Sequence, residues 1–433
     1  MTLLGTQMAM TSRSPLWEGA DALPATAPDR HRVRAIAYYL PQFHAIAEND
    51  AWWGAGFTEW RTVTKALPRF AGHYQPRLPA DLGFYDLSDV CTIRRQADLA
   101  ARGGIFGFCI HDYWFGGERL LETPLELILA NRDIPLRFCL NWANENWTRT
   151  WDGLDRQVLK AQRHSPADDL AYAAHLLRCF ADPRYIRIDG RPLMMLYRPG
   201  ILPDAKATVA RWRDFFRANG EADPYVIMPQ AFGENDPATF GMDAVAGFPP
   251  HKVSAHLENV SAELALYDTA FTGAVHDYAE AARTEKAMRE AQVKLFPGVC
   301  LGWDNDARRP GRGVTIAGAT PALYGDWLHD AGVYVLGQPP GHALGNGSAD
   351  EAPEDAIVFI NAWNEWGEGT YLEPDLHFGH AFLAETRRVI DALNAGTPRA
   401  NTGGSATAAL RSTRRKLFNR VRRKLLGMVA PKP

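Results

Sequence analysis

Two glutamates near the end of the chain are the residues whose type and spacing point most directly to chemistry. Glu365 and Glu368 stand three residues apart, directly after the apolar run Phe359–Ile360, and glycines on both sides of Glu368 permit a tight turn. Two carboxylates in one aromatic-lined site are what glycosidic bond cleavage uses, one as proton donor and one as base or nucleophile. An isolated pair of this spacing would be read as surface charge. The neighbouring tryptophans and the position after an apolar run favour the catalytic interpretation.

Further polar and aromatic residues follow other apolar runs of the chain. Their side chains offer hydrogen bonds to sugar hydroxyls and flat faces for sugar C–H groups. Each residue alone is equally consistent with a structural role, but their shared position after apolar runs predicts a sugar-binding cleft. The predicted substrate contacts are Tyr39, Gln42, Glu59, Trp60, His111, Tyr113, Trp114, Asn141, Glu145, Trp303, Asp304, Asn361, Trp363 and Trp366.

These residues must be positioned by a framework of alternating strands and helices. Short apolar runs separated by longer helical patterns are typical of repeated βα units and a parallel sheet. Eight such units over about 360 residues predict a single (β/α)8 barrel with long βα loops, and a doubly wound open sheet is the alternative. The barrel is favoured because it brings the ends of all strands to one face. The eight expected strands are 34–40, 105–111, 136–141, 192–197, 225–230, 243–248, 298–303 and 357–363, and expected helices include 89–102, 167–180, 206–218, 278–290 and 380–394.

The composition is that of an ordinary globular protein of 433 residues with a formal net charge of −3. That charge provides no large positive field, so nucleic acid is not an expected partner. Residues 1–32 are rich in Ala, Pro, Thr and Ser and are expected to form a flexible arm before the barrel at 33–394. We find no signal-peptide pattern and no apolar stretch of roughly 20 residues, so a cytoplasmic location is expected.

Residues 395–433 differ sharply from the rest of the chain. A Gly- and Ser-containing linker is followed by nine basic side chains and no acidic one between positions 411 and 432. Apolar residues recur there at helical spacing, as in helices that lie on anionic membranes. The sequence therefore predicts peripheral contact with the inner face of a membrane, with a solvated tail or a protein-docking helix as alternatives.

Several longer motifs resemble a known family. They are Tyr38–His44, Gly56–Trp60, Asn141–Trp147, Gly302–Asn305 and Asn364–Thr370. The last resembles the signature of glycoside hydrolase family 99, the endo-α-mannosidases. The whole of 33–394 is more similar to the WbsX-type proteins of bacterial surface-polysaccharide clusters, which are commonly labelled glycosyltransferases. The resemblance agrees with a barrel.

The resemblance also implies roles for the two glutamates. The residue matching Glu365 would deprotonate the sugar 2-hydroxyl, so that this oxygen displaces the leaving group internally. The residue matching Glu368 would protonate the departing oxygen and then activate the acceptor, with retention of configuration. The implied substrate is an oligo- or polysaccharide of O-antigen or related biosynthesis, free or lipid-linked, and neither a cofactor nor a metal is required. Whether water or a hydroxyl accepts the sugar stays open.

Two other functions remain open at this stage. Asp304 and Asp306 form a D-x-D pattern, which holds a divalent cation in nucleotide-sugar-dependent glycosyltransferases. Dependence on such a cation would favour that mechanism. The other alternative is a carbohydrate-binding protein without activity. In that case Glu365→Gln would keep its affinity for the polysaccharide, and no turnover would be seen even with the parent protein.

Overall fold

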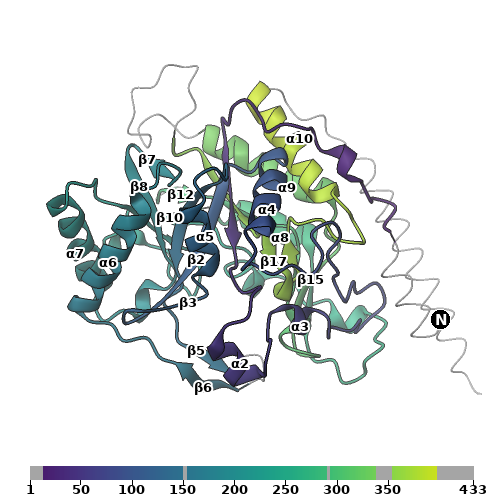
Figure 1. The fold of residues 1–433 in the computed structure, drawn as a ribbon. Coiled ribbons are helices and arrows are strands. Elements are labelled where there is room, and N and C mark those ends of the chain that lie inside the picture. Colours follow the sequence, from purple (N-terminus) through teal and green to yellow (C-terminus); the bar gives the residue numbers. More distant parts are fainter. Residues whose placement is uncertain (1–12, 150–153, 290–292, 338–353, 397–433) are drawn as a thin grey trace, which may run out of the picture.

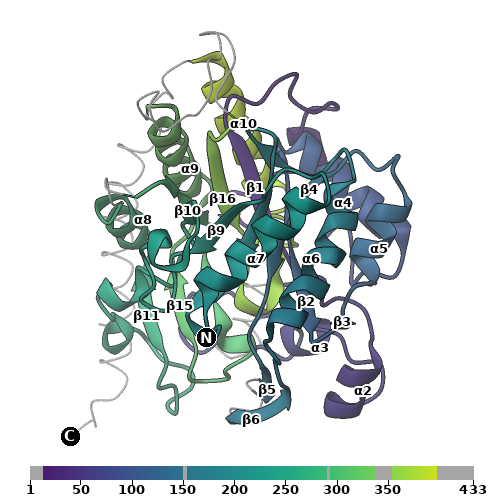
Figure 2. The same ribbon diagram turned by 90° about the vertical axis from the view of Figure 1, so that its left-hand side faces the viewer.

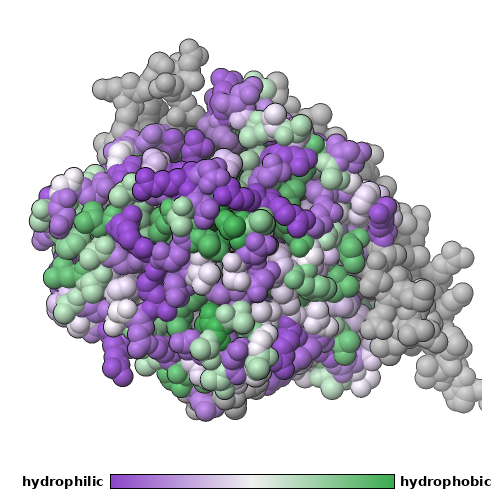
Figure 3. All heavy atoms as spheres, viewed as in Figure 1, coloured by the Kyte–Doolittle hydropathy of each residue, from purple (hydrophilic) through white to green (hydrophobic). Residues whose placement is uncertain are grey.

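The computed structural model describes residues 13–149, 154–289, 293–337 and 354–396. The basic segment at 411–432 lies outside the described residues, so its predicted membrane contact remains a prediction. None of the described helices is long and apolar enough to cross a membrane. On the face seen in Figure 3, hydrophobic residues are interspersed among hydrophilic ones.

A ring of parallel strands forms the centre of the molecule (Figures 1 and 2). Neighbouring strands follow one another in chain order, and the last large strand pairs with the first, as in a (β/α)8 barrel. The predicted fold is confirmed, and all eight expected strands are present. They are β1 (Arg34–Tyr39), β2 (Gly107–Phe115), β4 (Arg137–Trp142), β8 (Arg191–Leu196), β9 (Tyr225–Pro229), β10 (Ala244–Ala246), β13 (Gly298–Cys300) and β16 (Ile357–Asn361).

The barrel is closed by a strand that the sequence analysis located only in part. The strands β12 (Leu295–Phe296) and β13 are separated by Pro297. Proline lacks a backbone N–H and interrupts the hydrogen-bond ladder between strands. β12 pairs with β10 and β13 pairs with β16, so one short segment joins both sides of the ring. The Pro297 carbonyl still accepts a hydrogen bond from Phe359 N at 2.9 Å.

Helices cover the outside of the strands (Figures 1 and 2). Most begin at a residue whose side chain accepts a hydrogen bond from the first turn, for example Asp89, Ser165 and Thr320. The helices expected from the sequence are present, with ends that differ by a few residues. The ring consists of α4 (Val90–Arg102), α5 (Thr123–Ala130), α6 (Pro166–Phe180), α7 (Ala205–Ala218), α8 (Tyr278–Ala287), α9 (Pro321–Leu336) and α10 (Ala381–Ala395).

Long loops after the strands carry short elements of their own. Three small strands form a separate sheet in the order β11–β15–β14, and β17 pairs with β18 in the loop after β16. These loops build the face on which the polar residues gather. The short elements are α2 (Ala47–Trp53), α3 (Trp60–Val63), β3 (Glu118–Leu120), β5 (Trp147–Arg149), β6 (Leu154–Lys160), β7 (Arg187–Ile188), β11 (Ala274–Asp277), β14 (Trp303–Asp304), β15 (Val314–Ala317), β17 (Asn364–Glu365), β18 (Thr370–Tyr371) and the 3₁₀ turns η1 (Ala20–Ala22), η3 (Pro199–Ile201), η4 (Pro237–Phe240), η5 (Ser254–His256), η6 (Ser261–Glu263), η7 (Asn305–Ala307) and η8 (Trp366–Glu368).

Residues 13–32 lie against α10 and the loop before it. Ser14 N donates to the His377 carbonyl, and Glu18 both donates to Phe378 and accepts from His380 N. Leu23 is part of the main hydrophobic core. This part of the segment, expected to be a flexible arm, therefore makes specific contacts with the barrel.

Candidate functional site

Glu365 and Glu368 lie in the loop that follows β16, at the carboxyl end of the barrel. Asn364 and Glu365 pair with Thr370 and Tyr371 in a two-residue antiparallel ladder, and the 3₁₀ turn between them carries Glu368. Glu368 N donates to Glu365 Oε1 at 3.2 Å. The short turn therefore places both carboxylates side by side, on the face where the active sites of such barrels are built.

Arg308 joins the two glutamates to a third carboxylate. Its Nη2 donates to Glu365 Oε1 at 2.9 Å, its Nη1 lies 3.3 Å from Glu368 Oε1, and its Nε donates to Glu59 Oε1 at 2.8 Å. Only 14% of the Arg308 side chain is exposed, and Glu59 is fully buried. The sequence analysis predicted Glu365 and Glu368 as catalytic residues and Glu59 as a substrate contact, but it missed the arginine that connects them. Glu59 has no exposed surface to offer a substrate. We call these four residues the carboxylate cluster.

Gly367 is required by the geometry of this cluster. A Cβ atom at this position would lie 2.3 Å from Glu59 Oε1 and 2.9 Å from Arg308 Nε. Neither distance is possible for a real methyl group. The glycine between the two glutamates therefore lets the buried ion pair of Glu59 and Arg308 pack directly against the turn.

Burial controls the protonation of the cluster. Burial raises the pKa of Glu365 well above its ordinary value, and the Arg308 guanidinium opposes that rise only in part. Burial raises the pKa of Glu368 in the same way. Burial alone would lower the pKa of Arg308, but the carboxylates of Glu365, Glu59 and Glu368 hold it above its usual range. The cluster therefore combines a permanent cation with carboxyl groups that hold protons at unusually high pH.

A second group of polar residues lies on the neighbouring strands β1, β2 and β4. His111 Nδ1 lies 3.3 Å from the Tyr39 carbonyl, and its Nε2 lies 3.4 Å from Asn141 Nδ2. Burial lowers the pKa of His111 to about 4, so the imidazole is neutral at physiological pH. Gln42 Nε2 donates to the Tyr113 hydroxyl at 3.0 Å. The structure thus brings the side chains of four predicted contacts together, those of Gln42, His111, Tyr113 and Asn141. Charges of the carboxylate cluster act on the pKa values of His111 and Tyr113, so this group lies near the cluster.

The loop after β9 contains an exposed aromatic ring that the sequence analysis did not identify. Phe232 is 45% exposed and has a left-handed backbone with φ of 58°, which is unusual for an aromatic residue. Arg198 covers one face of its ring at 4.3 Å, and Arg198 in turn pairs with the predicted Glu145 at 2.6 Å. Tyr197 contacts Phe232, and the carboxylates of Glu145 and Glu368 both act on its pKa, which burial raises. A ring exposed in this way offers a stacking face for a sugar.

Most of the predicted aromatic contacts are packing residues instead. Their polar atoms are engaged inside the protein, and their rings are at most 7% exposed. The sequence could not show this, because it gives the position of a residue after a strand but not the direction of its side chain. The engaged donors are the Tyr39 hydroxyl to Gln96, Trp60 Nε1 to Tyr85, Trp114 Nε1 to Asp168 and Trp366 Nε1 to Glu373.

Three further predicted contacts are also buried. Trp363 is fully buried beside Phe108, at a ring distance of 5.1 Å. Trp303 is 5% exposed and contacts His251. Asn361 donates to the Pro249 carbonyl at 2.7 Å. These residues support the loops that surround the cluster rather than presenting a free face to a ligand.

The two aspartates of the D-x-D pattern are fully buried and already paired. Asp304 Oδ2 accepts hydrogen bonds from His73 and Gln75, both at 2.7 Å. Burial would raise the pKa of Asp304, but His73 and the nearby Arg77 hold it down at about 2. Asp306 pairs with Arg69 at 2.9 Å. The prediction that Asp304 contacts substrate does not fit this geometry, since none of its side chain is exposed. Among the described residues, no group of three or more metal-ligating side chains could hold a metal ion.

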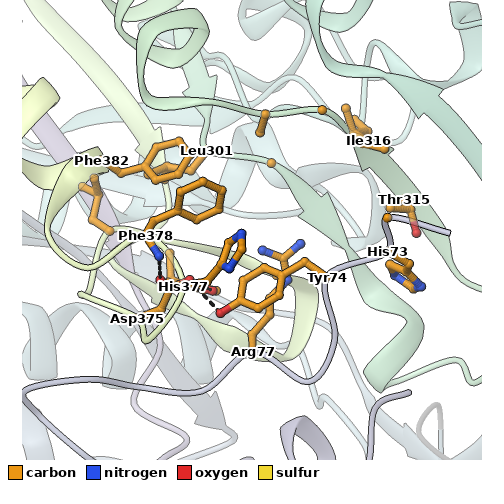
Figure 4. Close-up of a pocket in the computed structure, with 18 of the residues that line it drawn as sticks. His73, Tyr74, Arg77, Leu301, Thr315, Ile316, Asp375, His377, Phe378 and Phe382 are labelled. Carbon is orange, nitrogen blue, oxygen red and sulfur yellow. Dashed lines mark hydrogen bonds between the residues drawn. The ribbon is translucent and has the colours of Figure 1, made fainter. Parts of the chain in front are cut away.

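A cavity lies next to the loop that carries Glu365 and Glu368, but neither of these two residues lines it. Its volume is about 310 Å³, and its walls include His73, Tyr74, Arg77 and His377 (Figure 4). Gly369, which directly follows Glu368, also lines it. The cavity and the carboxylate cluster are therefore two separate features on opposite sides of one loop.

Comparison with known proteins gives matches over most of the chain. Residues 35–386 match the family model described as glycosyltransferase WbsX. Two curated WxcX proteins, from strains B100 and ATCC 33913 of Xanthomonas campestris pv. campestris, are 46% identical over 369 residues. That match covers 85% of this chain and 50% of each relative, so the chain spans about half the length of the curated relatives it matches.

Solved structures are similar at the level of the fold. A glycoside hydrolase-like protein has a TM-score of 0.51 at 14% sequence identity, covering 89% of this chain and 99% of its own. A family 99 endo-α-mannosidase from Bacteroides thetaiotaomicron gives a TM-score of 0.49 at 16% identity, covering 84% of this chain and 98% of its own. The first of these matches supports the barrel assignment.

Proposed function

Since the chain belongs to the WbsX glycosyltransferase family, as its motifs indicated, we propose that it cleaves or transfers glycosidic bonds with Glu365 and Glu368. The observation that carries the proposal is the carboxylate cluster: the buried Glu59 and Glu365 and the partly exposed Glu368 share one arginine at the carboxyl end of the barrel. Burying this much charge is costly, so such a cluster is expected where chemistry needs it.

The geometry supports different roles for the two glutamates. Arg308 and the backbone N–H of Glu368 both bind Oε1 of Glu365, which leaves Oε2 to take a proton. The pKa values of both carboxyl groups are raised by burial, so these shifts suit proton transfer but do not divide the roles. The Glu368 side chain is 23% exposed, compared with 7% for Glu365, so Glu368 is the one better placed to reach a departing oxygen. Glu365 is therefore assigned as base and Glu368 as acid.

The proposed reaction has two steps. In the first, Glu365 takes the proton of the sugar 2-hydroxyl, whose oxygen forms a bond to the anomeric carbon while the departing oxygen takes a proton from Glu368. The first step closes a three-membered ring of C1, C2 and the 2-oxygen. In the second step, Glu368 takes a proton from water or an acceptor hydroxyl, whose oxygen attacks the anomeric carbon. The bond from the 2-oxygen to that carbon breaks, and Glu365 returns its proton to the 2-oxygen. Two inversions give net retention.

The substrate in this proposal is an oligo- or polysaccharide of bacterial surface-polysaccharide or O-antigen biosynthesis, free or lipid-linked. Family membership supports the carbohydrate class. The site adds Tyr113 and His111 as hydrogen-bonding groups and Phe232 as a stacking face, while Asn141 is fully buried behind His111. The basic segment at 411–432 would hold the enzyme near an anionic membrane in which a lipid-linked substrate is embedded.

Turnover measurements on glutamate variants test the proposal. The chain is incubated with released and with lipid-linked glycans of the host, and product mass is followed for the parent, Glu365→Gln and Glu368→Gln. Loss of positioned proton transfer should slow turnover by about a hundredfold or more in each variant. Glu263→Gln is the matched control, because Glu263 is exposed in a loop. Turnover within about twofold of the parent in both variants contradicts the assigned roles.

The metal-dependent mechanism finds less support. Both aspartates that it needs are occupied by His73, Gln75 and Arg69. A chelator should therefore leave turnover unchanged. A carbohydrate-binding protein without activity would show glycan affinity but no product in any glycan mixture, including with the parent chain.

A further inference from the structure

The cavity beside the glutamate loop has the size of a small-ligand site. Its volume of about 310 Å³ is at the lower end of the range for such pockets, which suits a single sugar ring with its substituents. Three loops form it, at residues 70–77, 301–319 and 369–382. Because neither Glu365 nor Glu368 lines it, its ligand would not be the group that reacts.

One side of the cavity is apolar and the other is polar (Figure 4). Leu301, Phe378 and Phe382 form the apolar side. On the polar side the Tyr74 and His377 rings lie 4.6 Å apart, next to Arg77 and Asp375. A sugar matches such a cavity, because its C–H faces contact aromatic rings while its substituents bind the polar groups.

The acidic groups around the cavity already have their hydrogen bonds. Asp375 accepts from the Tyr74 hydroxyl at 3.1 Å, from the Tyr371 hydroxyl at 2.7 Å and from Phe378 N at 2.5 Å. Asp304 lies fully buried beneath the cavity, and both of its oxygens accept hydrogen bonds. Glu373, the other acid in the cavity wall, accepts from Trp366 Nε1, the Tyr85 hydroxyl and Gln96 Nε2. These three acids therefore have little capacity left for a donor on a ligand.

Arg77 is the group with spare capacity. A guanidinium has five N–H donors. Arg77 interacts with the Tyr371 side chain, but its nearest carboxylate oxygen, on Asp304, is 3.7 Å away, beyond hydrogen-bond distance. Its Nε is buried against Gly369, where a Cβ atom would lie 2.8 Å from it, and its guanidinium lies over the Tyr74 and Tyr371 rings at 5.0 and 5.9 Å. Of its side chain 16% is exposed, so the remaining N–H groups at the cavity wall can donate to an acceptor on a ligand.

We infer that this cavity binds an anionic sugar, a pyranose ring that carries a carboxylate, with the carboxylate on Arg77 and the ring against Tyr74 and Phe378. Guanidinium and carboxylate groups match in shape and charge, and such hydrogen bonds are among the strong ones. At the carboxylate cluster, the negative charges of the three glutamates repel an anionic ligand. The anionic sugar therefore binds in the cavity, and the two sites bind different parts of one glycan or different molecules.

Binding of three small probes to the full chain tests the ring and the charge separately. D-glucuronate, D-glucose and inorganic phosphate are titrated calorimetrically. Glucuronate should bind about tenfold or more tightly than glucose, which lacks the charge, and than phosphate, which lacks the ring. Equal affinity for glucose overturns the role of Arg77, and equal affinity for phosphate overturns the role of the ring.

Two variants locate the site. Arg77→Met should reduce glucuronate affinity about tenfold or more and leave glucose unaffected. Because Arg77 also supports Asp304, Ala319→Trp provides a second test: Ala319 lines the cavity, and an indole there fills it without removing a contact. Arg309→Met, at an exposed arginine, is the control. Undiminished glucuronate binding by folded Ala319→Trp overturns the inference.

Glu365→Gln separates this inference from the proposed function. The substitution should abolish turnover if the proposed function is right, but it should leave glucuronate binding unchanged. Loss of glucuronate binding in Glu365→Gln would place the anion at the carboxylate cluster and refute the second site. Normal turnover in Glu365→Gln would refute the proposed function and leave the inference about the cavity intact.

Discussion

Arg308→Met is the substitution that tests the electrostatics of the carboxylate cluster most directly. The arginine nitrogens lie 2.8, 2.9 and 3.3 Å from the oxygens of Glu59, Glu365 and Glu368. Two unit charges about 4 Å apart interact with about 4 kcal/mol at an effective dielectric constant of 20, and desolvation offsets part of this. Removing one member of such a buried group should lower the free energy of unfolding by about 3–5 kcal/mol.

The same substitution should change the pH dependence of turnover in a defined direction. Arg308 favours the ionised form of Glu365 and so lowers its pKa. Without the arginine the carboxyl group keeps its proton to higher pH, and the base is available only at higher pH. The rising limb of kcat/KM should move up by at least about one pH unit, which corresponds to about 1.4 kcal/mol. The assay is kcat/KM measured from about pH 4 to about pH 9.

An exposed arginine on an outer helix provides the control for this prediction. Arg283 is exposed on α8, and Arg283→Met should leave both stability and the pH profile close to those of the parent. Adding Glu59→Gln to Arg308→Met should recover part of the lost stability, because it removes one of the unpaired carboxylates. If Arg308→Met folds and its pH profile superimposes on that of the parent, the reasoning about the cluster is wrong.

Three further predictions concern other positions. Burial raises the pKa of Glu373 to about 7, above its ordinary value of 4.5, so the folded state holds this proton more tightly than the unfolded state. The protonated Glu373 therefore stabilises the fold fully below about pH 4.5, and this stabilisation is lost as the pH rises to about 7. Tm should fall over that range in the parent, and Glu373→Gln should flatten the fall. Gly367→Ala should lower kcat about tenfold or more, because its Cβ would displace Glu59 from the carboxylate cluster. An unchanged kcat would contradict the close packing of Glu59 and Arg308 against Gly367. Phe232→Ala should raise KM for the glycan about threefold or more at constant kcat, and an unchanged KM would remove Phe232 from the cleft.

The fold could be predicted because its strands are continuous apolar runs and its helices have side-chain caps. Closure of the barrel was less visible, since Pro297 divides the seventh strand into two pieces, each too short to stand out. Pairing β12 with β10 and β13 with β16 is a tertiary feature that no local pattern records.

The site was predictable in its carboxylates but not in its arginine. Glu365 and Glu368 stand together in the sequence, whereas Arg308 lies 57 residues from Glu365 and 249 from Glu59. Trp60 and Trp366 follow strands as predicted contacts should, yet their rings contact each other at 5.6 Å inside the core. Position along a strand end identifies the correct face of the barrel, but side-chain direction depends on packing partners that are distant in sequence.

The contact between residues 13–32 and α10 affects where the barrel can be cut. Gly379 has no room for a side chain because the Glu18 carbonyl and the Trp17 indole occupy that space, and Glu18 also pairs with Arg388. Asn394 holds the backbone of Arg30 and Arg32. A protein shortened to begin at residue 33 would lose these bonds. We therefore expect such a shortened protein to be less stable than one that keeps residues 13–32.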